Sequence, residues 1–136
     1  MNRKIKFRGK PMTLDGKTCS DWVYGYNIWQ GITEPTICEI NHTPVNPDTV
    51  GQYTGFDVNG VEIYEGDIVY VPETEFNGEL KGEVIFDKGG WIVKSLRSDW
   101  GSELAWVLRI DHELHRPVRP AQVVGNIFDM EQFSLS

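Results

Sequence analysis

Turn signals recur along this chain about every ten residues, and their spacing constrains the fold more than any other feature. They include Asp15-Gly16, Asn59-Gly60, Glu65-Gly66-Asp67 and Lys88-Gly89-Gly90. Such Gly, Asn and Asp pairs tolerate the backbone angles that tight turns need. Between them, no window of about a dozen residues repeats apolar side chains at the helical period near 3.6. We therefore predict an all-β fold.

The N-terminal part is expected to contain three strands. Lys4–Arg8 alternates apolar and basic side chains, so one face of this strand should be apolar and the other charged. Trp22–Ile28 is expected to form the second strand. The third, Ile32–Ile40, is placed at a sheet edge because Pro35 cannot donate to a ladder.

The best linker candidate is Asn41–Asp48. Pro44 and Pro47 disfavour both a helix and a central strand here. The linker should therefore divide an N-terminal β lobe, residues 1–40, from a second domain, residues 48–136.

The second domain is predicted to be a meander that follows the Asn59-Gly60 hairpin. Its strands are expected over Ile68–Val71, Gly82–Asp87, Trp91–Leu96, Leu104–Ile110 and Gln122–Phe128. Short strands joined by tight turns suit a small SH3-like barrel, which closes its sheet and removes exposed edges. An OB-like barrel is the alternative. The tail, Asp129–Ser136, is expected to form a short helical turn or to fray.

Charge is distributed unevenly along the chain, whose formal net charge is −7 at pH 7. Five basic side chains and no acidic one lie in the first ten residues, whereas from Asp21 to Asp87 only Lys81 is basic. Affinity for nucleic acid comes largely from Lys and Arg, so the acidic body disfavours a nucleic-acid partner. The basic N-terminal arm is the exception.

Composition also bears on localisation. No apolar run approaches the ~20 residues that a membrane helix needs, and no apolar run follows the basic start as it would in a secretory signal. Cys19 and Cys38 are too few for a disulfide framework, which is typical of a reducing compartment. We expect a cytoplasmic protein with no membrane partner, and leave the pairing of the two cysteines open.

Two groups of residues are candidate sites of chemistry. His112 and His115 offer metal ligands, but residues three apart on a strand point to opposite faces and Pro117 would limit a helix there. The carboxylates of Glu65 and Asp67 suit acid-base catalysis only if burial separates their pKa values. An Asp after Gly more commonly accepts hydrogen bonds from the backbone amides of a turn.

Other motifs that are typical of enzymes do not occur in this sequence. No phosphate-binding glycine loop and no nucleophile elbow occur in the sequence, and neither cysteine stands in the context of a known nucleophile. We therefore predict no catalytic residue, no metal and no cofactor, and a protein that is not an enzyme.

Four aromatic side chains lie close together between positions 22 and 29, and alternation places the first three on one face of a strand. Exposed Trp and Tyr are typical anchors of protein interfaces, but the same side chains could fill a core between two lobes. Because lysines lie nearby in the sheet, stacking on single-stranded nucleic acid is a third interpretation. The candidate interaction surface comprises Lys4, Lys6, Trp22, Tyr24, Tyr26 and Trp29.

Several short motifs, spread over nearly the whole chain, form a recognisable pattern. They are Ile5-Lys6-Phe7-Arg8, Val23-Tyr24-Gly25, Val50-Gly51-Gln52-Tyr53-Thr54-Gly55, Asn59-Gly60, Ile63-Tyr64-Glu65-Gly66-Asp67-Ile68-Val69 and Val124-Gly125-Asn126-Ile127-Phe128. In order and spacing they resemble the YopX family of phage and prophage proteins. The resemblance implies a phage or prophage origin, an all-β fold with an SH3-like barrel in the C-terminal part, and homo-oligomers formed through the N-terminal part.

The resemblance implies no activity. The central residues of the motif therefore carry a structural expectation and no catalytic role; they are Gly51, Gln52, Tyr53, Gly55, Glu65, Gly66 and Asp67. Three functions stay open: a non-enzymatic protein-binding or assembly module with a host or phage protein partner, a nucleic-acid-binding β-barrel protein, and a hydrolase with an unrecognised site around Glu65 and Asp67. The first is the one that we expect.

Overall fold

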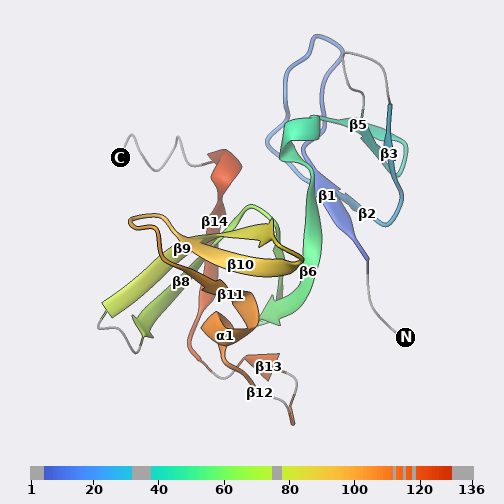
Figure 1. Ribbon diagram of the computed structural model, residues 1–136. Coiled ribbons are helices and arrows are strands. Elements are labelled where there is room, and N and C mark those ends of the chain that lie inside the picture. Colours follow the sequence, from blue (N-terminus) through green and yellow to red (C-terminus); the bar gives the residue numbers. More distant parts are fainter. Residues whose placement is uncertain are drawn as a thin grey trace. The chain divides into compact units, whose positions relative to one another are not determined.

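Antiparallel strands make up most of the protein (Figure 1), which confirms the all-β prediction. The computed structural model describes residues 5–31, 38–74, 78–111, 113–114, 116–117 and 119–129. The chain divides into two compact units, Met1–Tyr53 and Thr54–Ser136. Each unit has its own apolar core.

The first unit contains short strands and one turn of 3-10 helix. Its elements are β1 (Phe7–Gly9), β2 (Val23–Gly25), β3 (Ile28–Gln30), β4 (Cys38–Ile40), β5 (Thr43–Val45) and η1 (Pro47–Thr49). β1 pairs antiparallel with β2 and with the start of β6 (Gly51–Val58), while β3, β4 and β5 form a three-stranded sheet. Cys38, Ile40 and Val45 form the buried core of this unit.

The strand expected over Trp22–Ile28 is in fact two strands, β2 and β3, separated at Tyr26 and Asn27. Asn41 accounts for the break. Its side chain fills the space where a Cβ on Gly25 would lie, and its Oδ1 accepts a hydrogen bond of 3.2 Å from the Asn27 N–H. The Asn41 N–H donates in return to the Asn27 carbonyl at 2.8 Å. These bonds take Asn27 out of the β2 ladder.

Two further expectations for this unit are wrong. The described part of Ile32–Ile40, strand β4, is the central strand of its sheet and not an edge, and Pro35 lies outside the described residues. The expected linker, Asn41–Asp48, is folded: it contains β5, in which Val45 is buried. Pro44 lies on β5, the outer strand of this sheet. Proline lacks an N–H, but β5 still pairs with β4.

The second unit is built on a five-stranded antiparallel sheet with the strand order β11-β10-β9-β8-β14. These strands are β8 (Asp67–Thr74), β9 (Gly78–Asp87), β10 (Gly90–Ser95), β11 (Gly101–Glu103) and β14 (Gln122–Asn126). Among the described residues, the first four follow one another as a meander and β14 returns to pair with β8. β11 and β14 are the edges of this sheet.

Smaller elements complete this unit. β6 continues into it and pairs with β7 (Val61–Tyr64) through the turn at Asn59 and Gly60, whose φ angles of 53° and 80° confirm the expected hairpin. β12 (Ile110–Asp111) pairs with β13 (Arg116–Pro117). A 3-10 turn, η2, spans Ile127–Asp129, and the rest of the tail lies outside the described residues.

The segment Leu104–Ile110, expected to be a strand, begins instead with helix α1 (Leu104–Leu108). Leu104, Val107 and Leu108 are fully buried, and their spacing of three and four residues places them on one side of a helix. The fourth strand of the meander is β11, which precedes this helix. An apolar pattern that covers a single helical turn is too short to stand out in a window of a dozen residues. The prediction of a strand over this segment is therefore wrong.

Gly82, in β9, allows two strands to approach closely. A Cβ at this position would lie 2.6 Å from Val93 Cγ1 and 2.8 Å from the Lys94 carbonyl oxygen, whereas one on Gly90 would meet no atom within 4 Å. We expect Gly82→Ala to lower the free energy of unfolding by about 1–3 kcal/mol. Gly90→Ala is the matched control and should change it by less than about 0.5 kcal/mol. Urea denaturation of both variants checks this, and equal losses of stability would contradict it.

Candidate interaction surface

The paired strands β1 and β2 bring basic and aromatic side chains together on one face of the first unit. Arg8 pairs with Tyr24 in the ladder, so alternation places Lys6 and Lys10 on the side of Arg8 and Trp22 on the side of Tyr24. We call these five residues the basic-aromatic face.

Each ring of this face lies beneath a cation. Lys6 Nζ lies 5.5 Å from the centre of the Tyr24 ring. The Arg8 guanidinium carbon lies 4.0 Å from the centre of the Trp22 ring, and Lys10 Nζ lies 5.1 Å from it. Cations at these distances are attracted to the negative face of an aromatic ring. The face is therefore an interleaved stack rather than a row of separate side chains.

The basic side of this strand, which the alternation predicted to be a charged face, is largely buried. Arg8 and Lys10 are each only 5% exposed, whereas Ile5, expected on the apolar face, is exposed. Trp22 covers the two cations, and the Lys10 N–H donates a buried hydrogen bond of 2.9 Å to Thr49 Oγ1. Long basic side chains can bury their stems against apolar surface in this way. Lys4 lies outside the described residues.

The three other aromatic residues of the predicted surface are exposed. The exposed fractions are 46% for Tyr24, 61% for Tyr26 and 54% for Trp29. Tyr24 belongs to the basic-aromatic face, whereas Tyr26 lies in the break between β2 and β3 and Trp29 lies in β3. These three residues, which we call the exposed aromatic set, thus leave large apolar area uncovered by the chain.

The first part of the central motif joins β6 to β1. Gly51 and Gln52 pair with Arg8 and Phe7, and the Tyr53 N–H donates to the Lys6 carbonyl at 2.7 Å. The Tyr53 side chain is buried. Gly55 has a φ of 88°, in the left-handed region that favours glycine. The hydrogen bonds of Gly51, Gln52 and Tyr53 therefore fix the position of the N-terminal strand, which carries the basic side chains.

The second part of the motif is a hydrogen-bonded turn. Asp67 is buried, and its Oδ2 accepts a hydrogen bond of 2.7 Å from the Tyr64 N–H. Gly66, with a φ of 92°, has a carbonyl that accepts a hydrogen bond of 2.7 Å from the Ile127 N–H. Tyr64 Oη lies 3.0 Å from Glu62 Oε1. The Asp67 and Glu62 carboxylates are thus both hydrogen-bonded to Tyr64, the first to its N–H and the second to its hydroxyl. Glu65 is half-buried.

The candidate metal ligands and nucleophiles are described only in part. It contains no cluster of three or more His, Cys, Asp or Glu side chains that could hold a metal ion. His112 and His115 lie outside that part. Burial raises the pKa of the Cys38 thiol, and a raised pKa disfavours the thiolate that a nucleophile needs.

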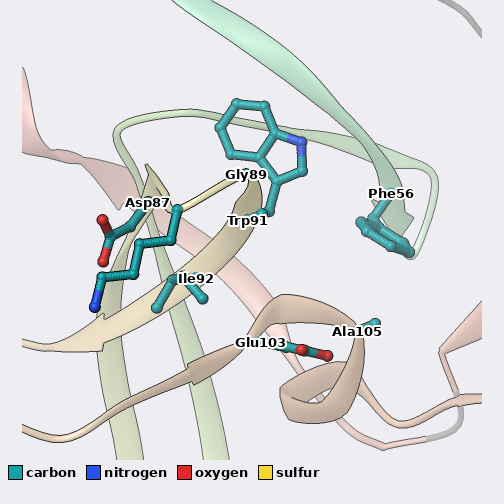
Figure 2. Close-up of a pocket in the computed structure, with 9 residues that line it drawn as sticks. Phe56, Asp87, Gly89, Trp91, Ile92, Glu103 and Ala105 are labelled. Atoms are coloured by element: carbon teal, nitrogen blue, oxygen red, sulfur yellow. The ribbon is translucent and has the colours of Figure 1, made fainter.

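The second unit carries an open groove of about 480 Å³ that sequence reasoning did not identify. Figure 2 shows Phe56 and Trp91 on two sides of it, with Glu103 and Ala105 at the start of α1 and Asp87 at the end of β9. Trp91 also packs edge to face against Phe86, with ring centroids 5.0 Å apart. The groove combines residues from three separate segments, so no local pattern in the sequence points to it.

Among the described residues, no helix is long and apolar enough to cross a membrane.

The chain matches the model of a known protein family. The model of the family described as YopX protein matches residues 8–132, which covers nearly the whole chain. No curated protein and no solved structure matches it.

Proposed function

This chain belongs to the YopX family, and on the basis of its exposed aromatic set we propose that it is a non-enzymatic protein-binding or assembly module. We further propose that it is an accessory protein of a phage or prophage and acts in the host cytoplasm. Its binding surface is the exposed aromatic set of the first unit, bordered by the basic-aromatic face.

The observation that carries this proposal is the exposure of Tyr24, Tyr26 and Trp29 within a few residues of one another. Tyr and Trp are enriched at the energetically dominant positions of protein interfaces, because they bury large area at a small cost in side-chain entropy. The Lys6 ammonium lies over the Tyr24 ring and limits the conformations that this side chain can adopt. A surface restrained before binding loses less entropy when a partner docks.

The second unit supports a scaffold role. We propose that its sheet, which is open at β11 and β14 and does not form the closed barrel that was expected, is a variant of the SH3-like barrel, because β8 to β11 form a meander and β14 returns to β8 after the short helix α1. The engagement of Asp67 and Glu62 in the β7–β8 turn favours a structural over a catalytic role for these carboxylates.

Removal of two members of the exposed aromatic set should weaken binding while leaving the fold intact. We expect the double variant Tyr26→Ala/Trp29→Ala to weaken self-association or partner binding about tenfold or more. Leu14→Ala, at a fully exposed leucine of the same unit, is the matched control and should bind like the wild type. Light scattering measures self-association, and affinity capture from phage-infected cells after nuclease treatment measures partner binding.

Two results would overturn the proposal. One is a wild-type protein that is a monodisperse monomer and captures no protein from such cells. The other is a double variant that assembles and captures as well as the Leu14→Ala control does.

A second candidate function, single-stranded nucleic-acid binding, is favoured by one observation: cations and aromatic rings interleave on the basic-aromatic face. The burial of Arg8 and Lys10 weakens this candidate, because buried cations cannot displace counterions from phosphates. Binding of a labelled oligonucleotide that weakens as salt rises, and that Lys6→Ala reduces, would support it. No binding at low salt would eliminate it.

A further inference from the structure

The three-stranded sheet of the first unit has one face that packs on the core of this unit and one that does not. The core side chains share the first face; they are Ile28, Cys38, Ile40 and Val45. Successive side chains of a strand point to opposite faces of its sheet. Trp29 on β3, Glu39 on β4 and Pro44 on β5 therefore point away from the core.

On this outer face the three side chains stand next to one another. In the strand ladders Trp29 lies directly opposite Glu39, and Glu39 lies directly opposite Pro44. Residues in such positions have Cβ atoms about 4.5–5.5 Å apart. An indole ring and a proline ring thus flank one carboxylate, within the reach of a single ligand group. We call these three residues the outer row.

The outer row is accessible to a ligand. Trp29 is 54% exposed and lies on β3, an edge strand of this sheet, while Pro44 is exposed and Glu39 is half-buried. Within the described part of the chain, no hydrogen bond or ion pair engages the Glu39 carboxylate. Partial burial strengthens the attraction of a carboxylate to a cation, because less water screens the charge. A cationic ligand can therefore bind Glu39 without breaking an existing contact.

The part of the chain that forms this sheet supplies no cation of its own. Residues 21–53 contain four acidic side chains and neither lysine nor arginine. All basic side chains of the first unit come from residues 1–17. Surfaces with an excess of one charge attract partners of the opposite charge. The outer row is therefore suited to a basic group from another molecule.

We propose that the outer row receives an arginine side chain of a partner protein. A guanidinium stacks on an aromatic ring through its flat face and donates paired hydrogen bonds to a carboxylate through its edge. Trp29 offers the first contact and Glu39 the second, while the Pro44 ring packs against the methylene stem of the arginine. This inference rests on the proposed function, because Trp29 belongs to the exposed aromatic set, and it adds the chemistry of the ligand.

A second copy of this chain is a poor source of the arginine. Of the arginine side chains that the structure describes, Arg8 and Arg119 are buried, whereas Arg97 and Arg109 are exposed. These two lie in the second unit, whose fifteen acidic and seven basic side chains give a formal net charge of −8. Their docking would bring this unit against an acidic sheet, and such like-charge contact is unfavourable.

The test uses the full chain and a short capped peptide with one arginine between alanines and glycines. Its twin carries citrulline, which keeps the shape of the side chain and removes its charge. We expect the arginine peptide to shift the backbone amide NMR signals of residues 28–30 and 38–40, and the citrulline peptide to leave them in place.

Two variants examine the two contacts separately. Glu39→Gln should weaken binding of the arginine peptide about tenfold, as loss of a charge-assisted hydrogen bond does. Trp29→Leu, which keeps an apolar side chain and removes the ring, should weaken it about three- to fivefold. Asp21→Asn is the matched control, at an exposed carboxylate of the same unit outside the outer row, and should bind like the wild type.

Several results would overturn the inference: equal binding of the two peptides, no shift of the signals at residues 28–30 and 38–40, or equal affinity of Glu39→Gln and Asp21→Asn. Self-association that Glu39→Gln abolishes would identify a second copy as the occupant and would overturn it as well.

The outcome is separable from that of the proposed function. If Glu39→Gln captured a protein partner as well as the wild type did, while Tyr26→Ala/Trp29→Ala did not, the arginine site would fail and the proposed function would stand. Arginine-selective peptide binding by a chain that neither self-associates nor captures any protein would support the arginine site and overturn the proposed function.

Discussion

Leu108→Ala is expected to lower the free energy of unfolding by about 3–5 kcal/mol, the largest loss that we expect from a single side chain here. Leu108 is fully buried in α1 and belongs to the core that α1 shares with β10 and other strands of the second unit. A helix of five residues has almost no stability of its own. The cavity would therefore remove packing that the helix needs in order to form at all.

Leu114→Ala provides the matched control, because Leu114 is an exposed leucine of the same unit. It should change stability by less than about 0.5 kcal/mol. Urea denaturation followed by tryptophan fluorescence measures both variants. Equal midpoints for the two would mean that α1 does not contribute to the core as described.

Asp67→Ala should cost about 2–3 kcal/mol of folding stability, as expected when a hydrogen bond donated to a buried carboxylate is lost. Its Oδ2 accepts the Tyr64 N–H, and alanine would leave that buried amide without this acceptor. Asp67→Asn keeps an oxygen at the same place and should lose less. Thermal unfolding of the two variants separates these cases, and an alanine variant as stable as the wild type would remove the structural role.

The strand content and several turns could be predicted because their causes are local. The Asn59-Gly60 hairpin and the turn at Lys88-Gly89 depend on residues that tolerate positive φ, and the chain adopts positive φ at all four. The pattern of apolar residues could not place α1, because all five of its residues are apolar and a single turn is too short to show the helical period.

Features set by contacts between distant segments could not be predicted. The break after β2 depends on Asn41, fourteen residues beyond Asn27. The burial of Arg8 and Lys10 depends on Trp22, which lies across the strand pair. Alternation correctly places basic side chains on one side of β1, but it gives no information on what covers them.

The candidate sites, too, could be predicted only in part. The concentration of aromatic residues between positions 22 and 29 is evident from the sequence, but which of them are exposed could not be predicted from it. The groove could not be identified, because the residues that line it, among them Phe56, Trp91 and Glu103, belong to segments that are far apart in the sequence.

Strand β6 has a consequence for how such a protein can change during evolution. It begins in the first unit, where it pairs with β1, and ends in the second, where it pairs with β7. Recombination that exchanged one unit for a foreign one would have to cut within this strand, and each half would then need a partner of matching register. The two units should therefore be inherited together, and new binding specificity should arise by substitution at surface positions such as Tyr26 and Trp29 rather than by swapping of modules.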